Sequence, residues 1–305
     1  MAPIQTTVEG KEHAPATPSG DVMQRAQAAR ARKMPLIMGV LNVTPDSFSD
    51  GGRFLKTDDA LAQARRMIAE GADIIDIGAE STRPYGGMQP VTADEERERL
   101  VPILSGVVSL GVPVSLDTMK AEVARWGLDQ GVALLNDVWG LQRDPAMAQV
   151  AAERGTPIVV MHNRDTADAT IDIFADVDAF FTRTLAIAAQ AGVPRENLIL
   201  DPGIGFGKTP QQSLALIGAL ARLDRFGLPL LLGASRKRFI DSVCPSPPDR
   251  RLGGSIASHL VAAAHGAAIL RVHDVWETVQ ALHVKQAIAD AAAALSERQI
   301  GREPE

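Results

Sequence analysis

Residues 35–52 read PLIMGVLNVTPDSFSDGG and change character halfway along. The first part, Leu36–Leu41, is apolar without alternation, which is typical of a strand buried on both faces of a parallel sheet. From Asn42 onward the segment is polar, Pro45 favours a turn, and the closing glycines allow positive φ angles. Because ligands of α/β folds bind beyond the C-terminal ends of strands, this segment is a candidate binding loop. An ordinary solvated connection is the alternative for the segment taken alone.

The same succession of apolar strand, polar loop and amphipathic helix repeats along the chain. The predicted strands cover residues 36–41, 73–79, 112–116, 133–135, 157–161, 198–200, 229–233 and 267–270. The predicted helices cover residues 58–70, 92–110, 120–130, 144–154, 175–191, 210–225, 254–265 and 276–298. About eight such units in roughly 270 residues predict the α/β class and a (β/α)8 TIM barrel. An open doubly wound sheet is the alternative, but no Gly-x-Gly-x-x-Gly turn follows the first strand.

Length and composition bound the organisation and the partners. The 305 residues, 46% of them hydrophobic, suit one large domain. We expect a largely disordered N-terminal extension over 1–33 with a short helix at 21–33, the barrel at 34–299, and a tail at 300–305. The net charge of −6 gives no reason to expect a nucleic-acid partner. Neither a signal-peptide pattern nor a long apolar span stands out, and the single Cys244 suits a reducing compartment, so we expect a cytoplasmic protein without a membrane partner.

Polar residues recur where the predicted strands end. They are Asn42, Glu80, Ser81, Thr82, Arg83, Asp117, Asn136, His162, Asp201, Lys237, Arg271 and His273. In a barrel these positions converge on one mouth. Any one of them could be a structural hydrogen-bonder, but burying all of them without a ligand would be costly.

The residue types fall into two groups. Asp117, Asn136, Asp201 and Lys237 suit a flat heterocycle that carries N–H donors and carbonyl acceptors. Thr82, Arg83, Arg271 and His273 suit an anion such as phosphate. Asn42, beside the acidic loop, is a candidate ligand of Mg²⁺, which takes few protein ligands together with phosphate oxygens and waters.

A glycine-rich segment, DPGIGFGKT at 201–209, is similar to a phosphate-binding loop but does not match it. The Gly-x-x-x-x-Gly-Lys-Thr pattern requires glycine at position 202, which is Pro202. We therefore interpret the segment as a wall that lets a planar ligand approach the backbone, and we do not predict a nucleotide triphosphatase.

Seven segments together resemble the dihydropteroate synthases of the folate pathway. They are NVTPDSFSDGG (42–52), ESTRPYGG (80–87), SLDTMK (115–120), LLNDVWG (134–140), DPGIGFGKT (201–209), GASRKRF (233–239) and RVHDV (271–275), in family order. The resemblance implies a transferase that joins 6-hydroxymethyl-7,8-dihydropterin diphosphate to 4-aminobenzoate, giving 7,8-dihydropteroate and pyrophosphate. It also implies a sulfonamide target and a homodimer, because such barrels often pair through helices.

The resemblance also assigns roles by position. It implies that Asp117, Asn136, Asp201 and Lys237 bind the pterin, that Asp117, Asp201 and Lys237 act in catalysis, and that Asn42 binds Mg²⁺. Thr82, Arg271 and His273 would contact the diphosphate, and Phe48, Arg83, Pro84 and Ser235 the aminobenzoate. The segment after His162 departs from the commoner, Met-rich form, so the fifth loop cannot be carried over.

Two other functions compete with this one. A related pterin-binding methyltransferase shares the ring pocket but needs no diphosphate site, so Arg271, His273 and the 42–52 loop speak against it. A non-catalytic paralogue would keep the fold and the pterin pocket without turnover. Release of pyrophosphate in the presence of aminobenzoate separates the synthase from both.

Overall fold

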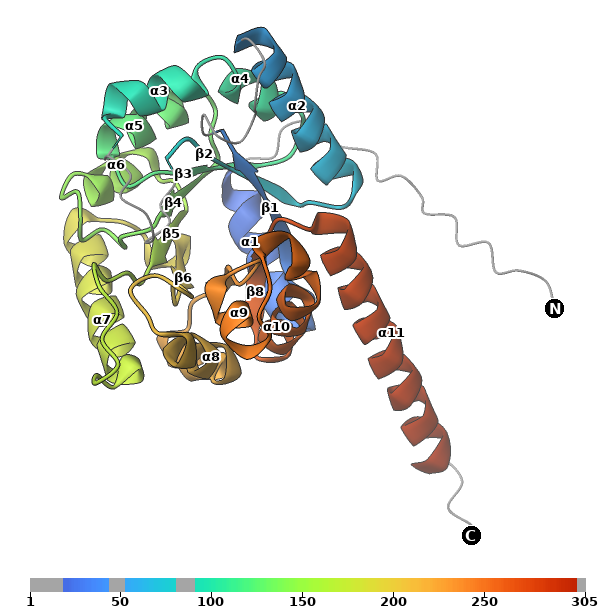
Figure 1. The fold of residues 1–305 in the computed structure, drawn as a ribbon. Coiled ribbons are helices and arrows are strands. Elements are labelled where there is room, and N and C mark those ends of the chain that lie inside the picture. Colours follow the sequence, from blue (N-terminus) through green and yellow to red (C-terminus); the bar gives the residue numbers. More distant parts are fainter. Residues whose placement is uncertain (1–18, 44–52, 81–90, 301–305) are drawn as a thin grey trace.

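The computed structural model describes residues 19–43, 53–80 and 91–300. Eight parallel strands form a closed barrel in sequence order (Figure 1). They are β1 (Leu36–Asn42), β2 (Ile74–Gly78), β3 (Val114–Asp117), β4 (Leu134–Asp137), β5 (Ile158–Met161), β6 (Leu198–Asp201), β7 (Leu230–Leu232) and β8 (Ala267–Val272). Because β1 pairs with β8 as well as with β2, the sheet has no edge. The (β/α)8 prediction is confirmed, and the doubly wound alternative is wrong.

Helices surround the strands on the outside of the barrel (Figure 1). They are α2 (Arg53–Ala69), α3 (Ala93–Leu100), α4 (Leu104–Val108), α5 (Ala121–Asp129), α6 (Met147–Arg154), α7 (Ile173–Ala191), α8 (Pro210–Gly218), α9 (Arg238–Val243), α10 (Leu252–Ala264) and α11 (Val275–Ile300). Their apolar faces and the outward strand residues form the larger of two hydrophobic clusters.

Two of the predicted helices are shorter than expected. The helix predicted over 92–110 is divided into α3 and α4, because Pro102 has no N–H to continue the hydrogen-bond ladder. Its start is as predicted: Thr92 accepts from the backbone of Glu95, and the Glu95 side chain accepts from the Thr92 N–H. The helix predicted over 210–225 ends as α8 and continues as a 3₁₀ helix over Leu220–Phe226.

The smaller hydrophobic cluster fills the N-terminal end of the barrel. It contains Met38, Ile74, Leu134, Val159, Ile199, Leu231, Ala268 and Ile269 from the strands and Val22, Met23 and Ala26 from helix α1 (Ser19–Arg32). Side chains two residues apart on a strand point to the same face, so the residues that follow these by two positions also face the interior. On four strands those next positions carry polar residues of the mouth, namely Asp76, Asn136, Asp201 and Arg271.

Helix α1 lies within the expected N-terminal extension but packs against β8 and β1. Val22 and Ala26 are fully buried, and Arg25 lies 2.5 Å from Asp73, whose other carboxylate oxygen accepts from the N–H of Ile37. The helix therefore closes the N-terminal end of the barrel. The remaining residues of the expected extension, 1–18, and of the expected tail beyond 300 lie outside the described residues. In the described part of the chain, every helix is too short or too polar to cross a bilayer.

Candidate active site

The guanidinium of Arg271 lies at the centre of the barrel's C-terminal end. Its Nε donates to Oδ2 of Asp76 at 2.6 Å, and Nη2 donates to Oδ2 of Asp117 at 2.7 Å. Asp76 is fully buried and the Arg271 side chain is only 21% exposed. Strands β8, β2 and β3 thus contribute one charged side chain each to a network with two carboxylates and one cation.

Asn136 extends this network from β4. Its amide Nδ2 lies 3.3 Å from Oδ2 of Asp76, and Asn136 is paired in register with Asp117. Asp117 is paired in turn with Gly78, two residues after Asp76. Parallel pairing in this register brings the ends of β2, β3 and β4 to one level, which explains why residues distant in sequence meet.

Asp76 was not predicted as a site residue. It lies within DIIDIGA (73–79), a segment for which the sequence predicts only a strand. A signal was present, because Asp76 follows the apolar Ile74 by two positions on the same face of the strand. A carboxylate in the interior of an otherwise apolar strand requires a buried partner, which here is Arg271.

Lys237 and Asp201 form the other side of the site. Nζ of Lys237 donates to the carbonyl of Ile204 at 2.5 Å and lies 4.6 Å from the centroid of the Phe206 ring. A Cβ built on Gly233 would lie 3.8 Å from this Nζ and 3.9 Å from Cδ of Arg271, so the two cations are neighbours across Gly233. Asp201 accepts from the N–H of Gly203 at 2.7 Å.

Burial and mutual charge shift the pKa values of these groups. Burial raises the pKa of Asp117 to about 7, with Asp76 reinforcing the shift and Arg271 opposing it. Burial also raises the pKa of Asp201, against the positive charge of Lys237. Burial lowers the pKa of Lys237 to about 8. Burial by itself would lower the pKa of Arg271 as well, but the negative charges of Asp76 and Asp117 outweigh burial and raise this pKa.

Other predicted site residues lie at the mouth but form separate contacts. His273 donates its backbone N–H to Oγ of Ser235 at 3.2 Å, and its Nδ1 lies 3.0 Å from the same hydroxyl. Asn42 is the last residue of β1 and is paired with Gly78. Arg271, which the sequence groups with His273 as an anion contact, instead pairs with Asp117 of the ring-binding group and with Asp76. Phe48, Thr82, Arg83 and Pro84 lie outside the described residues, as do most of the loops at 42–53 and 81–90.

One atom of the site lacks a partner. Oδ1 of Asp117 is buried and accepts no hydrogen bond from any described residue. A buried carboxylate oxygen without a donor is costly, so the site is complete only when a ligand N–H reaches it.

Asn42 is the predicted protein ligand of Mg²⁺. Residues 19–43, 53–80 and 91–300 contain no group of three His, Cys, Asp or Glu side chains that could hold a metal. A closed protein cage is therefore not formed by this part of the chain. Mg²⁺ usually keeps waters and binds one or two protein oxygens plus phosphates, so the amide oxygen of Asn42 fits it.

Fold and site together define a barrel enzyme whose mouth binds a flat, nitrogen-rich ring. The family model for pterin binding enzymes matches residues 38–273. The Bacillus subtilis dihydropteroate synthase is 46% identical over 252 residues, which is 82% of this chain and 87% of that protein.

Solved structures of dihydropteroate synthases are also similar to this chain. A Clostridium difficile dihydropteroate synthase, solved with pteroic acid, has a TM-score of 0.80 and 44% identity, covering 83% of this chain and 96% of that one. The Xanthomonas albilineans enzyme, solved with 4-aminobenzoic acid, has a TM-score of 0.79 and 42% identity, covering 84% and 93%. The chain belongs to the dihydropteroate synthases, within the family of pterin binding enzymes.

Proposed function

We infer that the protein condenses 6-hydroxymethyl-7,8-dihydropterin diphosphate with 4-aminobenzoate to give 7,8-dihydropteroate and pyrophosphate. The family membership and the small molecules bound to the related structures, pteroic acid and 4-aminobenzoic acid, support this reaction. The observation that carries it for this chain is the unpartnered Oδ1 of Asp117 beside Arg271. An amino or ring N–H of the pterin would supply the missing hydrogen bond.

The ring would be held by four residues. Asp117 and Asp201 accept from its N–H groups, Asn136 both donates and accepts, and Lys237 donates to its carbonyl or ring nitrogen. As the C–O bond to pyrophosphate breaks, positive charge develops on the CH₂ carbon and on the pterin ring to which it is attached. The carboxylates of Asp117 and Asp201 favour that charge electrostatically, because they are already placed in a poorly solvated site.

The leaving group would be stabilised by positive charge at the rim. Arg271, His273 and Thr82 would contact the diphosphate, and Mg²⁺ held at Asn42 would neutralise part of its charge when bound. Since Arg271 is paired with Asp76 and Asp117, we expect a ligand N–H to take over part of that pairing. The neutral aniline nitrogen attacks and loses its proton after the bond has formed, so no strong general base is required.

The second substrate would lie beside the loops. Phe48, Arg83, Pro84 and Ser235 are the proposed contacts of the aminobenzoate, and closure of the loops at 42–53 and 81–90 would exclude water. A sulfonamide with the same aniline end would compete for these contacts, so we propose that the protein is a sulfonamide target.

The test is a pyrophosphate-release assay on Asp117→Asn, matched with Ser115→Ala. Ser115 lies two residues earlier on β3, is buried, and its Oγ also has no partner among the described residues. We expect turnover to fall roughly 100-fold in Asp117→Asn, because a preorganised charge is removed, and to change less than about threefold in Ser115→Ala. Unchanged turnover in Asp117→Asn would exclude the proposed role.

The same assay separates the competing functions. Methyl transfer from methyltetrahydrofolate without pyrophosphate release would identify the methyltransferase. Tight binding of the pterin diphosphate without any turnover by the unmodified protein would identify a non-catalytic paralogue.

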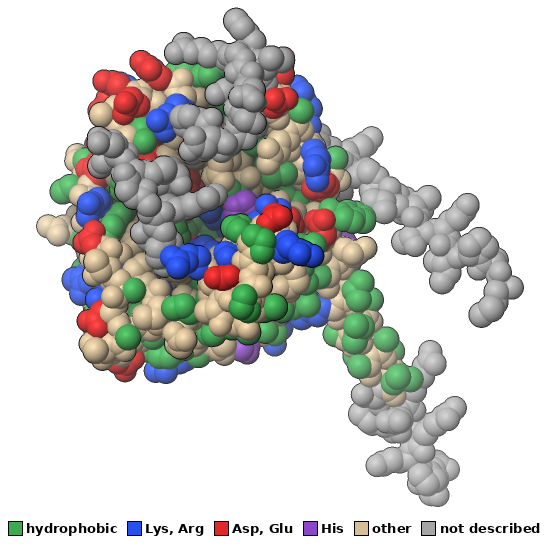
Figure 2. Space-filling model, in the orientation of Figure 1, with side chains coloured by type: hydrophobic (Ala, Val, Ile, Leu, Met, Phe, Trp, Pro, Cys, Tyr) green, Lys and Arg blue, Asp and Glu red, His purple; other side chains and the backbone are tan. Residues whose placement is uncertain are grey.

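We further propose a homodimer formed through α10 and α11. Helix α11 extends away from the barrel and carries hydrophobic side chains on its surface (Figures 1 and 2). Val284 is 54% exposed and Ile288 is 66% exposed, beside a groove lined by Leu260 and Ala281. Apolar surface of this kind marks interfaces.

In sedimentation, Ile288→Asp should be monomeric, and Val243→Asp, at an exposed apolar position on α9, should remain dimeric. A dimeric Ile288→Asp would exclude this interface.

We place the protein in the cytoplasm. The single Cys244 is exposed and unpaired, which agrees with a reducing compartment. Fractionation of cells that express the full chain would test this location.

A further inference from the structure

Lys208, at the end of the glycine-rich segment, is a buried cation. Its residue is only 2% exposed, and its ammonium donates to the carbonyls of His162 at 3.2 Å and Phe206 at 3.0 Å. Both acceptors are neutral, and none of the described carboxylates forms an ion pair with it. A buried ammonium that is only partly compensated is costly, so a functional reason for it is expected.

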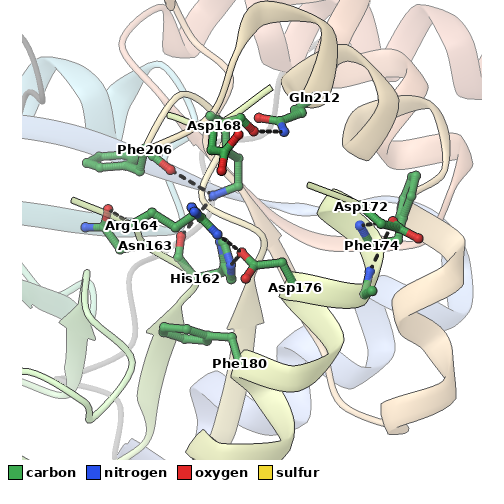
Figure 3. A network of polar contacts seen from close by, with 12 residues as sticks. His162, Asn163, Arg164, Asp168, Asp172, Phe174, Asp176, Phe180, Phe206 and Gln212 are labelled. Atoms are coloured by element: carbon green, nitrogen blue, oxygen red, sulfur yellow. Dashed lines mark hydrogen bonds and ion pairs between the residues drawn. The ribbon is translucent and has the colours of Figure 1, made fainter. Parts of the chain in front are cut away.

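The segment that receives Lys208 is itself firmly held. The backbone N–H of His162 donates to the carbonyl of Asp201 at 2.9 Å, and Nε2 of His162 lies 3.0 Å from Oδ2 of Asp176. Arg164 lies 2.8 Å from the same carboxylate oxygen. Figure 3 shows His162 and Arg164 converging on Asp176, with Phe180 below. Side-chain and backbone contacts therefore hold the end of β5, which accepts the hydrogen bond from the ammonium of Lys208.

The glycine-rich backbone lies directly on the end of β5. A Cβ built on Gly203 would lie 1.9 Å from the carbonyl oxygen of His162, and one on Gly207 would lie 2.3 Å from Cβ of Arg164. Both glycines have positive φ. Between them, Ile204 presents the carbonyl that accepts from Lys237. Lys208 thus fastens the loop that positions a proposed pterin-binding residue.

Lys208 also acts on Asp201 through its charge. The positive groups that oppose the burial-induced rise in the pKa of Asp201 are Lys237, Lys208 and Arg271. Around Lys208 itself, Asp201 and Asp176 favour the cation, while burial, Lys237 and Arg164 disfavour it and lower its pKa. The nearby His162 contributes no positive charge at neutral pH, because burial and Lys208 lower its pKa to about 3.

We propose that Lys208 is a positioning residue: its ammonium fastens the glycine-rich segment to the end of β5 and places a positive charge near Asp201, a proposed pterin-binding residue. This inference rests on the proposed function of the site. It assigns to Lys208 two effects, one geometric and one electrostatic, that can be measured separately.

The first experiment compares Lys208→Met with Gln212→Met. Methionine keeps the volume but removes the donors and the charge. Gln212 joins the start of α8 to the loop after β5, donating Nε2 to the carbonyl of Asp168 at 2.7 Å, but carries no charge. We expect Lys208→Met to bind pterin diphosphate roughly tenfold more weakly at neutral pH, since charged hydrogen bonds are lost. Its loss of affinity on acidification should begin at a higher pH, because the pKa of Asp201 rises without Lys208.

The control separates position from charge. Gln212→Met should weaken binding without moving the pH at which affinity is lost. An unmoved acid limb in a folded Lys208→Met would overturn the electrostatic part, and unchanged affinity would overturn the inference as a whole.

A second measurement does not depend on the folding of Lys208→Met. Charge coupling is reciprocal, so Asp201→Asn should lower the pKa of Lys208, observed by NMR on protein labelled with ¹³Cε-lysine. An identical Lys208 titration in the unmodified protein and in Asp201→Asn would overturn the coupling. If the unmodified protein released no pyrophosphate, the proposed function would fail, but the coupling measured by NMR would stand. Turnover by the unmodified protein together with an unaffected Lys208→Met would refute this inference alone.

Discussion

The two ends of the barrel are built by the same strands but contain opposite chemistry. On four strands an apolar inward residue is followed, two positions later, by a polar one: Ile74 and Asp76, Leu134 and Asn136, Ile199 and Asp201, Ile269 and Arg271. The apolar members form a dry layer with α1, and the polar members form the mouth. The residue types two positions apart on the same strands, together with the cover that α1 provides at one end, make one end a core and the other a site.

The difference has an energetic consequence. The apolar layer is complete without a ligand, because its side chains contact one another and α1. The polar layer is incomplete, since Oδ1 of Asp117 lacks a donor among the described residues. Substitutions in the lower layer should thus affect stability alone, whereas those in the upper layer should affect stability and turnover together.

The largest effect is expected for Arg271→Met, compared with Ile269→Val on the same face of β8. Removing the cation leaves Asp76 and Asp117 buried without their partner, which should cost about 3–5 kcal/mol of unfolding free energy and abolish measurable turnover. The loss should be smaller at pH 5 than at pH 8, because Asp117, whose pKa burial raises to about 7, can then bind a proton. Ile269→Val should cost about 0.5–1.5 kcal/mol with normal turnover. Denaturant unfolding measures the loss of stability in both variants, and equal losses would refute the distinction between the two ends.

The next largest effect is expected at the closed end. Ala26 of α1 is fully buried against the barrel, so Ala26→Asp should lower the unfolding free energy by about 3 kcal/mol. The neighbouring Gln27 is exposed, and Gln27→Asp should change the unfolding free energy by less than about 0.5 kcal/mol. Turnover per folded molecule should be the same in both. If Ala26→Asp impaired catalysis in the folded protein, the two ends would not be independent.

An intermediate effect concerns the pH dependence of the mouth. Burial lowers the pKa of Lys237 to about 8, so this side chain is a cation below that pH and loses its proton above it. Affinity for pterin diphosphate should fall as the pH is raised through about 8. Arginine stays protonated, so Lys237→Arg should bind more weakly at neutral pH, by roughly tenfold, but without an alkaline limb. Calorimetry with the same ligand on both proteins cancels titration of the ligand, and parallel curves would contradict the assignment.

The smallest effect tests how α1 is held. Arg30 lies 2.8 Å from Asp224, but both side chains are partly exposed, so Arg30→Ala should cost less than about 0.5 kcal/mol. A cost comparable to that of Ala26→Asp would mean that ion pairs, and not apolar contacts, hold α1 on the barrel. Thermal unfolding at low and high salt gives the answer, because only an ion-pair contribution is screened.

Much of the fold followed from local patterns. Each strand was predicted within a few residues, because apolar runs that end in polar loops are short and repeated. The capping box at Thr92 was predicted for the same local reason, whereas the division at Pro102 and the short helix α9 were missed. Asp117, Asn136, Asp201 and Lys237 were found because they stand at strand ends. Asp76 and Lys208 were missed because one lies inside a strand and the other in a segment interpreted as a wall.

By itself, the sequence determined the number and order of the strand–helix units and the residues at their ends, since apolar runs and helical patterns act over a few residues. Only the tertiary structure decided which of these residues form ion pairs and hydrogen bonds with one another. Closure of β1 onto β8 brings Arg271 to Asp76 across 195 positions, and pairing of β5 with β6 brings the ammonium of Lys208 to the carbonyl of His162. Such pairings depend on register and burial around the whole barrel, which no local pattern encodes.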